Sequence, residues 1–317
     1  MDACGHYAAD AGSVQRRLTS ERCFSEASGI DALAQRALRY LYLAPDQAET
    51  LRGRLPGADG ASPSEAERRS AVREFAKDLF VEESAVRFYG FRVQTRMAIV
   101  RLAGSRLLLY SPVPLRRRLR QELEQLGRIS FIVSPNKIHN LTLAEYRTAF
   151  SEAKLLVPPG LPERMPGLPF DAVLSDEPVP DWSPDLRHVL TRGNMFFAEA
   201  LLFHRPSRTL LVGDLVERIG PGIASPIARG VARLLGVSSH PMASPEFRYY
   251  TADADAFEAG MAEVLRWPIE RVFLCHGDLI EEKGREVVAR VVDTLVEEVR
   301  GRGRARRALF ERLARIQ

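Results

Sequence analysis

The sequence has 317 residues, of which 45% are hydrophobic and 27% are charged, with 22 Gly and 20 Pro. This composition is typical of a folded globular protein and excludes a disordered or fibrous chain. No apolar run approaches the roughly 20 residues that cross a bilayer, and the opening stretch MDACGHYAADAGSVQRR lacks the apolar segment of a secretory signal. We therefore expect a cytoplasmic protein with no membrane partner. Its three cysteines (Cys4, Cys23 and Cys275) are too few and too widely spaced to predict a disulfide framework or a cysteine-based zinc site.

The formal net charge of +4 comes from one end of the chain. Residues 300–317 hold seven Arg and one Glu, so this segment carries +6 and the rest of the chain −2. Leu309, Leu313 and Ile316 recur there at helical spacing. We favour a solvated amphipathic helix for this Arg-rich tail over a nucleic-acid-binding segment.

Residues 1–82 predict a helical N-terminal extension. Leu33, Ala37 and Leu41 keep a helical period, and a further helix is expected from Ser64 through Phe75 and Leu79. No catalytic pattern occurs in this extension.

Residues 83–299 predict an α/β domain. Three short β-rich runs near the start indicate an antiparallel meander, and the next stretch alternates helix and strand through RISFIVSP and KLLVPP. Three more strands are expected in RHVLTRG, FFAEALLFH and SRTLLVGD, followed by helices near 225–236 and 253–266, the strand RVFLCHGD and a long helix from about residue 284. The chain contains neither GxGxxG nor GxxxxGK[ST], so the common phosphate-binding loops are excluded.

Polar residues of the metal-ligand type follow three of the apolar strands. SPNKIHN comes after ISFIV, GDL after RTLLV, and CHGD after RVFL. Loops at the carboxyl ends of strands are where α/β proteins build their sites. We therefore expect His139, Asp214 and His276 to converge.

These phrases resemble the metallo-β-lactamase-like superfamily. The run RISFIVSPNKIHN is similar to the strand that ends in the superfamily's THxHxDH cluster, and the phrases ending in VGDL and CHGD fit its later sites in order. The motifs SPNxxHNL, HRPSRTL and HGD are closest to a branch described as a domain of unknown function. The resemblance covers roughly residues 84–295 and implies an αββα sandwich of two mixed sheets.

The chain departs from that superfamily at most of its metal ligands. Aligned on Ser134, Pro135 and Lys137 replace the first two histidines, His139 replaces the aspartate and Asn140 the third histidine. Asn194 replaces the next ligand histidine, so that only Asp214 and His276 keep their positions. A dinuclear zinc site needs more ligands than these, so the familiar β-lactamase and glyoxalase mechanisms are not transferred.

Two histidines and a carboxylate suffice for one zinc or iron ion with an open position. Our first interpretation is thus a metal-dependent hydrolase that acts on a small molecule, with Asp278 or Glu199 as general base. Asn136, Asn140 and Asn194 are expected around the metal or in the substrate pocket. A homo-oligomer is compatible with this interpretation.

Two other functions stay open. One is a relative without metal or catalysis that binds a small molecule or a protein; the other is an Fe(II)-dependent oxidoreductase. Each site residue also has a structural alternative: His139 as a helix cap, Asp214 as a turn residue, and Glu199 as a strand residue facing solvent. Cys275 is expected in the core, because alternation along a strand sends it away from His276.

Overall fold

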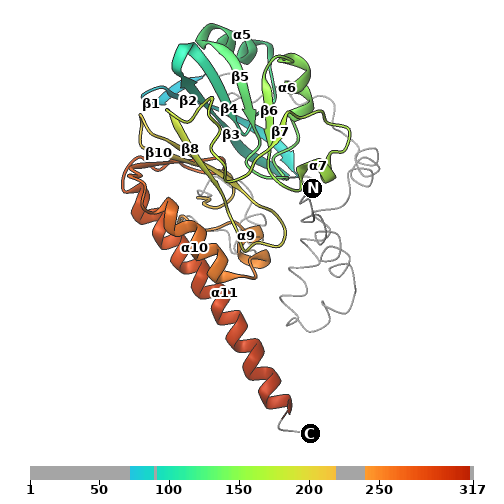
Figure 1. Cartoon of the computed structure of the whole chain (residues 1–317), viewed down its shortest axis with the longest axis vertical. Coiled ribbons are helices and arrows are strands. Elements are labelled where there is room, and N and C mark those ends of the chain that lie inside the picture. The colour runs from blue at the N-terminus through green and yellow to red at the C-terminus, as the bar shows by residue number, and fades with distance from the viewer. Residues whose placement is uncertain (1–71, 89–90, 219–239, 315–317) are drawn as a thin grey trace, which may run out of the picture. The chain divides into compact units, whose positions relative to one another are not determined.

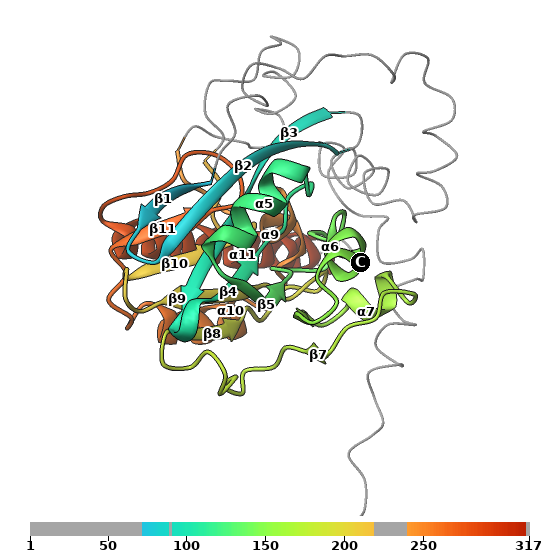
Figure 2. The same cartoon turned by 90° about the horizontal axis from the view of Figure 1, so that it is seen from above.

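The computed structural model describes residues 72–88, 91–218 and 240–314, all within one compact unit that spans Pro63–Gln317. The described part consists of two β-sheets packed face to face, with helices on both outer sides (Figure 1, and Figure 2 from above). The predicted αββα sandwich of two mixed sheets is therefore confirmed.

The first sheet has seven strands in the order of the sequence, β1 to β7. Strands β1 to β4 form antiparallel pairs, and β4, β5, β6 and β7 are parallel neighbours. The strands are β1 (Arg73–Ala76), β2 (Leu79–Phe88), β3 (Phe91–Leu102), β4 (Arg106–Tyr110), β5 (Arg128–Val133), β6 (Lys154–Val157) and β7 (Ala172–Val173). Helices α5 (Arg117–Leu126), α6 (Leu143–Ala149) and α7 (Leu161–Arg164) lie in the connections between β4 and β7, and a 3-10 turn (Ala103–Ser105) joins β3 to β4.

The second sheet has four strands in the order β11-β10-β9-β8. Strands β10 and β11 are parallel, whereas β9 pairs antiparallel with β8 and with β10. Its strands are β8 (Leu186–Leu190), β9 (Ala200–His204), β10 (Thr209–Val212) and β11 (Arg271–Leu274). Its helices are α9 (Pro245–Tyr250), α10 (Ala254–Val264) and α11 (Gly284–Ala314), so the backbone of residues 300–314 continues the last helix.

Two hydrophobic layers hold the sandwich together. The layer between the sheets contains residues of both, such as Val81, Tyr110, Leu202 and Phe273, and it also contains Cys275 as expected. The other layer joins the first sheet to its helices through buried residues such as Leu123 and Tyr146. Each sheet thus buries the face toward its partner, which fixes the loops at the sheet edges.

Most of the predicted elements are observed. The meander, the alternation of helices with parallel strands, the strands β8 to β11, and the helices near 253–266 and from residue 284 are all confirmed. One prediction is wrong: the helix expected through Phe75 and Leu79 is, over its described residues, the strand β1 and the start of β2. The boundary expected after residue 82 falls inside β2. The helices predicted before residue 72 and near 225–236 lie outside the described residues.

In the part of the chain that the structure describes, no helix combines the length and the apolarity that a membrane crossing requires.

Candidate metal centre

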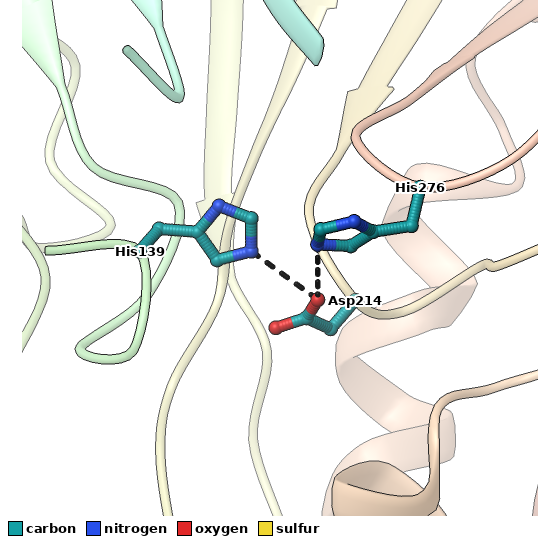
Figure 3. Close-up of side chains that lie close together, drawn as sticks. All are labelled: His139, Asp214 and His276. Carbon is teal, nitrogen blue, oxygen red and sulfur yellow. Dashed lines mark hydrogen bonds and ion pairs between the residues drawn. The ribbon is translucent and has the colours of Figure 1, made fainter. Parts of the chain in front are cut away.

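Three loops bring His139, Asp214 and His276 together. They follow β5 of the first sheet and the parallel strands β10 and β11 of the second. One ligand atom from each residue lies within 4.8 Å of the others. Figure 3 shows both imidazole rings directed at one carboxylate oxygen, Asp214 Oδ1, which is 3.2 Å from His139 Nε2 and 3.5 Å from His276 Nε2.

The second nitrogen of each ring is held from outside the cluster. His276 Nδ1 lies 2.9 Å from the backbone carbonyl oxygen of Gln94, which only accepts hydrogen bonds. Nδ1 therefore carries the proton, and in the neutral ring Nε2 presents its lone pair to the centre. His139 Nδ1 lies 2.9 Å from the hydroxyl of Ser111, just after β4. A histidine fixed in this way by a hydrogen bond at one nitrogen is typical of metal ligands.

Asp214 is buried and its two oxygens are used differently. Oδ2 accepts a 2.8 Å hydrogen bond from the side-chain amide of Asn136, which leaves Oδ1 to face the histidines. Asn136 is itself fully buried, and its own Oδ1 accepts from the backbone N–H of Ile138. Asn136 therefore orients the carboxylate and the loop of His139 at once.

Glu199 supports the loop of Asp214 by accepting hydrogen bonds from its backbone. Its Oε1 accepts from the backbone N–H groups of Gly213 and Leu215, at 2.9 and 3.2 Å. Its Oε2 accepts from the N–H of Asp214 at 2.7 Å and from Asn136 at 3.1 Å. The side chain is fully buried. The alternative that Glu199 faces solvent is wrong, because the loop after β10 folds back over it.

The loop of His276 is held by the opposite sheet. Arg96 of β3 is buried, and its Nη1 donates to the carbonyl oxygens of Leu274 and Gly277 at 2.8 and 2.7 Å. Gly277 has a φ of +89°, and a Cβ there would lie 1.8 Å from the carbonyl oxygen of Arg218. Only glycine fits at that approach, so the position directly after His276 is fixed by backbone packing.

Burial and charge set the protonation of the cluster. Burial opposes ionisation of Asp214, but the charge and hydrogen bond of His139, and then His276 and Asn136, lower its pKa to about 2. The Asp214 carboxylate in turn raises the pKa of His139 against the effect of burial, whereas burial prevails at His276 and lowers its pKa. Burial and then the charge of Asp214 raise the pKa of Glu199 to about 7. Asp214 is therefore ionised at neutral pH, and the pKa values of the two histidines shift in opposite directions.

The donor set of the cluster fits a divalent cation. It offers a carboxylate oxygen and two nitrogens of the preferred type, each already oriented by a neighbour. Within the described ranges, these three residues are the one group of His, Cys, Asp or Glu side chains close enough to hold a metal.

In the described part of the chain, the other predicted site residues (Asn140, Asn194 and Asp278) form no hydrogen bond with the three clustered residues. Asn140 donates to the carbonyl oxygen of Lys137, and Asn194 braces its own loop by accepting from the N–H groups of Phe196 and Phe197. Asp278 has an exposed side chain two residues after His276. A cavity of about 700 Å³ lies beside the connection from β11 to α11, and none of the three clustered residues lines it.

Sequence reasoning missed Ser111, Arg96 and the carbonyl of Gln94. Each acts through a contact between segments far apart in the chain. Because every residue has a backbone carbonyl, the residue type at position 94 does not predict that its carbonyl binds a histidine. Ser111 comes at the end of an apolar strand, the signal by which the three clustered residues were predicted, so the same rule could have found it.

Comparison with known proteins identifies the fold. A family model described as "Domain of unknown function (DUF4336)" matches residues 79–235. No curated protein matches the sequence. The metallo-β-lactamase FIM-1 from Pseudomonas aeruginosa, solved in its mono-zinc form, aligns with a TM-score of 0.50 and 13% identity over 72% of this chain and 96% of that one. The Flv1 flavodiiron core from Synechocystis sp. PCC6803 aligns with a TM-score of 0.51 and 11% identity over 72% of this chain and 61% of that one.

Identities this low show the fold alone. Together with the two mixed sheets and their outer helices, they establish that the chain has the metallo-β-lactamase-like fold.

Proposed function

We propose that the chain binds one divalent metal ion through His139, Asp214 and His276 and acts as a metal-dependent hydrolase. The observation that carries this proposal is that Nε2 of His139 and Nε2 of His276 both face one oxygen of the buried Asp214 carboxylate. A group outside the cluster holds the Nδ1 atom of each ring. Three protein ligands leave a position open, as in catalytic rather than structural zinc sites.

A single metal is favoured over two. The positions that hold further ligands in the resembling superfamily are here Pro135, Lys137, Asn140 and Asn194, and the two asparagine amides make hydrogen bonds away from the cluster. At these positions, and in the described part of the chain, fewer ligands are thus present than a dinuclear site requires.

Different residues would bind the metal, position its ligands and act as general base in hydrolysis. A metal bound at the three ligands would supply Lewis acidity, which polarises a substrate oxygen and makes water more acidic. Asn136 and Glu199 hold Asp214 in place. Glu199 uses both of its oxygens for this purpose. We therefore assign the general base to the other predicted carboxylate, Asp278, which is exposed and follows His276 by two residues.

Metal analysis of protein purified without an affinity metal tests the proposal. We expect close to one equivalent of zinc or iron, lost in both His139→Ala and His276→Ala. His188→Ala is the matched control, because His188 lies on β8 and binds the carbonyl of Ser175. Hydrolysis of a panel of chromogenic esters, lactams and phosphodiesters is followed in parallel. Unchanged metal content and activity in His276→Ala would overturn the proposal.

An Fe(II)-dependent oxidoreductase is the second candidate. Two histidines and one carboxylate are also the donor set of non-haem iron oxygenases, and this observation favours it. Bound iron with oxygen consumption and no hydrolysis would select it over the hydrolase. A chain that takes up no metal even after reconstitution would instead be a binding protein for a small molecule or a partner.

A further inference from the structure

Two cations, Lys137 and Arg164, form no ion pair in the described part of the chain and follow neighbouring strands of the first sheet. Lys137 occupies a position where the resembling superfamily has a ligand histidine, between Asn136 and His139 in the loop after β5. Its ammonium nitrogen lies 4.1 Å from the centre of the Phe196 ring. Its stem passes the turn that precedes α7, where a Cβ on Gly160 would lie 3.4 Å from Lys137 Cδ.

Arg164, at the end of α7, is the second cation. Its Nε is buried and has no hydrogen-bond acceptor. Arg164 lies four residues after Gly160, at the end of the short helix whose first turn the Lys137 stem passes. In the described ranges neither Lys137 nor Arg164 forms an ion pair, in contrast to the exposed Lys154, which binds Asp181 at 2.7 Å.

The topology places this pair at the edge that carries the metal ligands. β5 and β6 are parallel neighbours, so the loop of Lys137 and helix α7 follow the same ends of adjacent strands. Asn136, directly before Lys137, touches Asp214. An anion held by the pair would therefore lie at the same edge of the first sheet as the loop that carries His139.

We propose that Lys137 and Arg164 form a binding site for an oxyanion group, carboxylate or phosphate, of the substrate. The uncompensated charges of two partly buried cations at one sheet edge call for such a partner. A guanidinium matches the paired oxygens of either group, and an ammonium adds a point charge. The Phe196 ring holds the ammonium near the site by a cation–π contact without neutralising it. That the anion belongs to the substrate rests on the proposed hydrolase function; the anion site itself does not.

Anion binding is measured on the full-length chain, stripped of metal and dialysed free of chelator, so that a bound metal contributes nothing. Inorganic phosphate is followed by the broadening of its ³¹P resonance and ¹³C-labelled acetate by that of its carboxyl resonance. We expect saturable binding of at least one of them, and the preferred anion names the substrate class. In Lys137→Met and Arg164→Met the dissociation constant should rise at least tenfold.

Two exposed cations with ion-pair partners provide the controls. Lys154→Met and Arg120→Met, which lose pairs with Asp181 and Glu124, should leave anion binding unchanged. Equal weakening in these controls, equal affinity in all variants, or no saturable binding of either anion would overturn the anion site. His276→Ala separates the two proposals, because it should lose the metal and retain the anion. A chain that binds anions but no metal would refute the metal proposal alone.

Discussion

A buried carboxylate without a ligand role, Glu199, determines where Asp214 lies. It accepts four hydrogen bonds, three of them from the consecutive N–H groups of Gly213, Asp214 and Leu215. A Cβ on Gly213 would lie 2.9 Å from Glu199 Oε2, so the strand end can approach this closely only as glycine. Asp214 is thus positioned by its own backbone as well as by Asn136.

The substitution Glu199→Gln tests this positioning role. A glutamine keeps one oxygen but turns an NH₂ group toward two N–H donors, which leaves buried donors unpaired. We expect the free energy of unfolding in urea to fall by about 1–3 kcal/mol. We expect the dissociation constant for zinc to rise about 10–100-fold, as for other residues that support metal ligands.

Glu124→Gln is the matched control, because Glu124 is exposed and pairs only with Arg120 on the same helix. It should change the free energy of unfolding by no more than about 0.5 kcal/mol. If Glu199→Gln binds zinc as tightly as the unsubstituted chain, Glu199 does not position Asp214.

Sequence reasoning reached the clustered residues and named Asn136 and Glu199 near them, but it gave Glu199 a different role and missed Ser111 and Arg96. His139, Asp214 and His276 each follow an apolar strand, and burial of the strand fixes what comes after it. Glu199 gives no such signal, because its neighbours in FFAEALLFH are equally compatible with a carboxylate that faces solvent. Asn194 misleads in the opposite direction: it occupies a ligand position in the aligned pattern, but its amide braces a turn.

At the scale of elements, strand β3 controls the loop after β11. Arg96 extends from the first sheet to two carbonyl oxygens of the second, and its Nε and Nη2 bind Glu83 Oε1 at 3.1 and 2.9 Å. One guanidinium thus satisfies acceptors in both sheets. His276 lies between the two carbonyls in sequence, so its place depends on this link.

Arg96→Lys should loosen the loop of His276. An ammonium cannot reach all three acceptors of the planar guanidinium. We expect the unfolding free energy to fall by about 2–4 kcal/mol, because buried acceptors lose their donor. Amide hydrogen exchange of residues 275–278 should accelerate and zinc affinity should fall.

Arg101→Lys on the same strand is the control, since Arg101 is partly exposed and pairs with Asp78 at 3.7 Å. Unchanged exchange of residues 275–278 in Arg96→Lys would show that the second sheet holds the loop unaided.

The elements that sequence reasoning predicted well are those with strong local signals. Apolar runs bounded by turns predicted the parallel strands, and the helices near 253–266 and from residue 284 were predicted between and after them. The helix predicted through Phe75 and Leu79 failed because these residues also fit two strands, the short β1 and the longer β2. The chain turns at Asp78, with a φ of 57°, and Leu79 and Val81 then alternate into the core opposite β3. Pairing with a distant strand decided between the two patterns, and a local period does not contain it.

At the scale of the whole molecule, the candidate centre joins the two sheets. His139 comes from the first sheet, and Asp214 and His276 come from the second. A metal at these residues would bridge the halves of the sandwich and would require both to be folded. Metal binding should therefore add to the stability of the entire described domain.

Zinc added to the metal-free chain should raise its melting temperature. A ligand that binds only the folded state at 100 times its dissociation constant contributes about 2.7 kcal/mol. For a domain of this size that corresponds to a shift of roughly 5–10 °C. His139→Ala and His276→Ala should melt at the same temperature with and without zinc, whereas His188→Ala should keep the full shift. An equal rise of the melting temperature in His276→Ala would place the bound metal outside this cluster. An unchanged melting temperature of the parent chain at saturating zinc or iron would mean that the two sheets are held together without a metal.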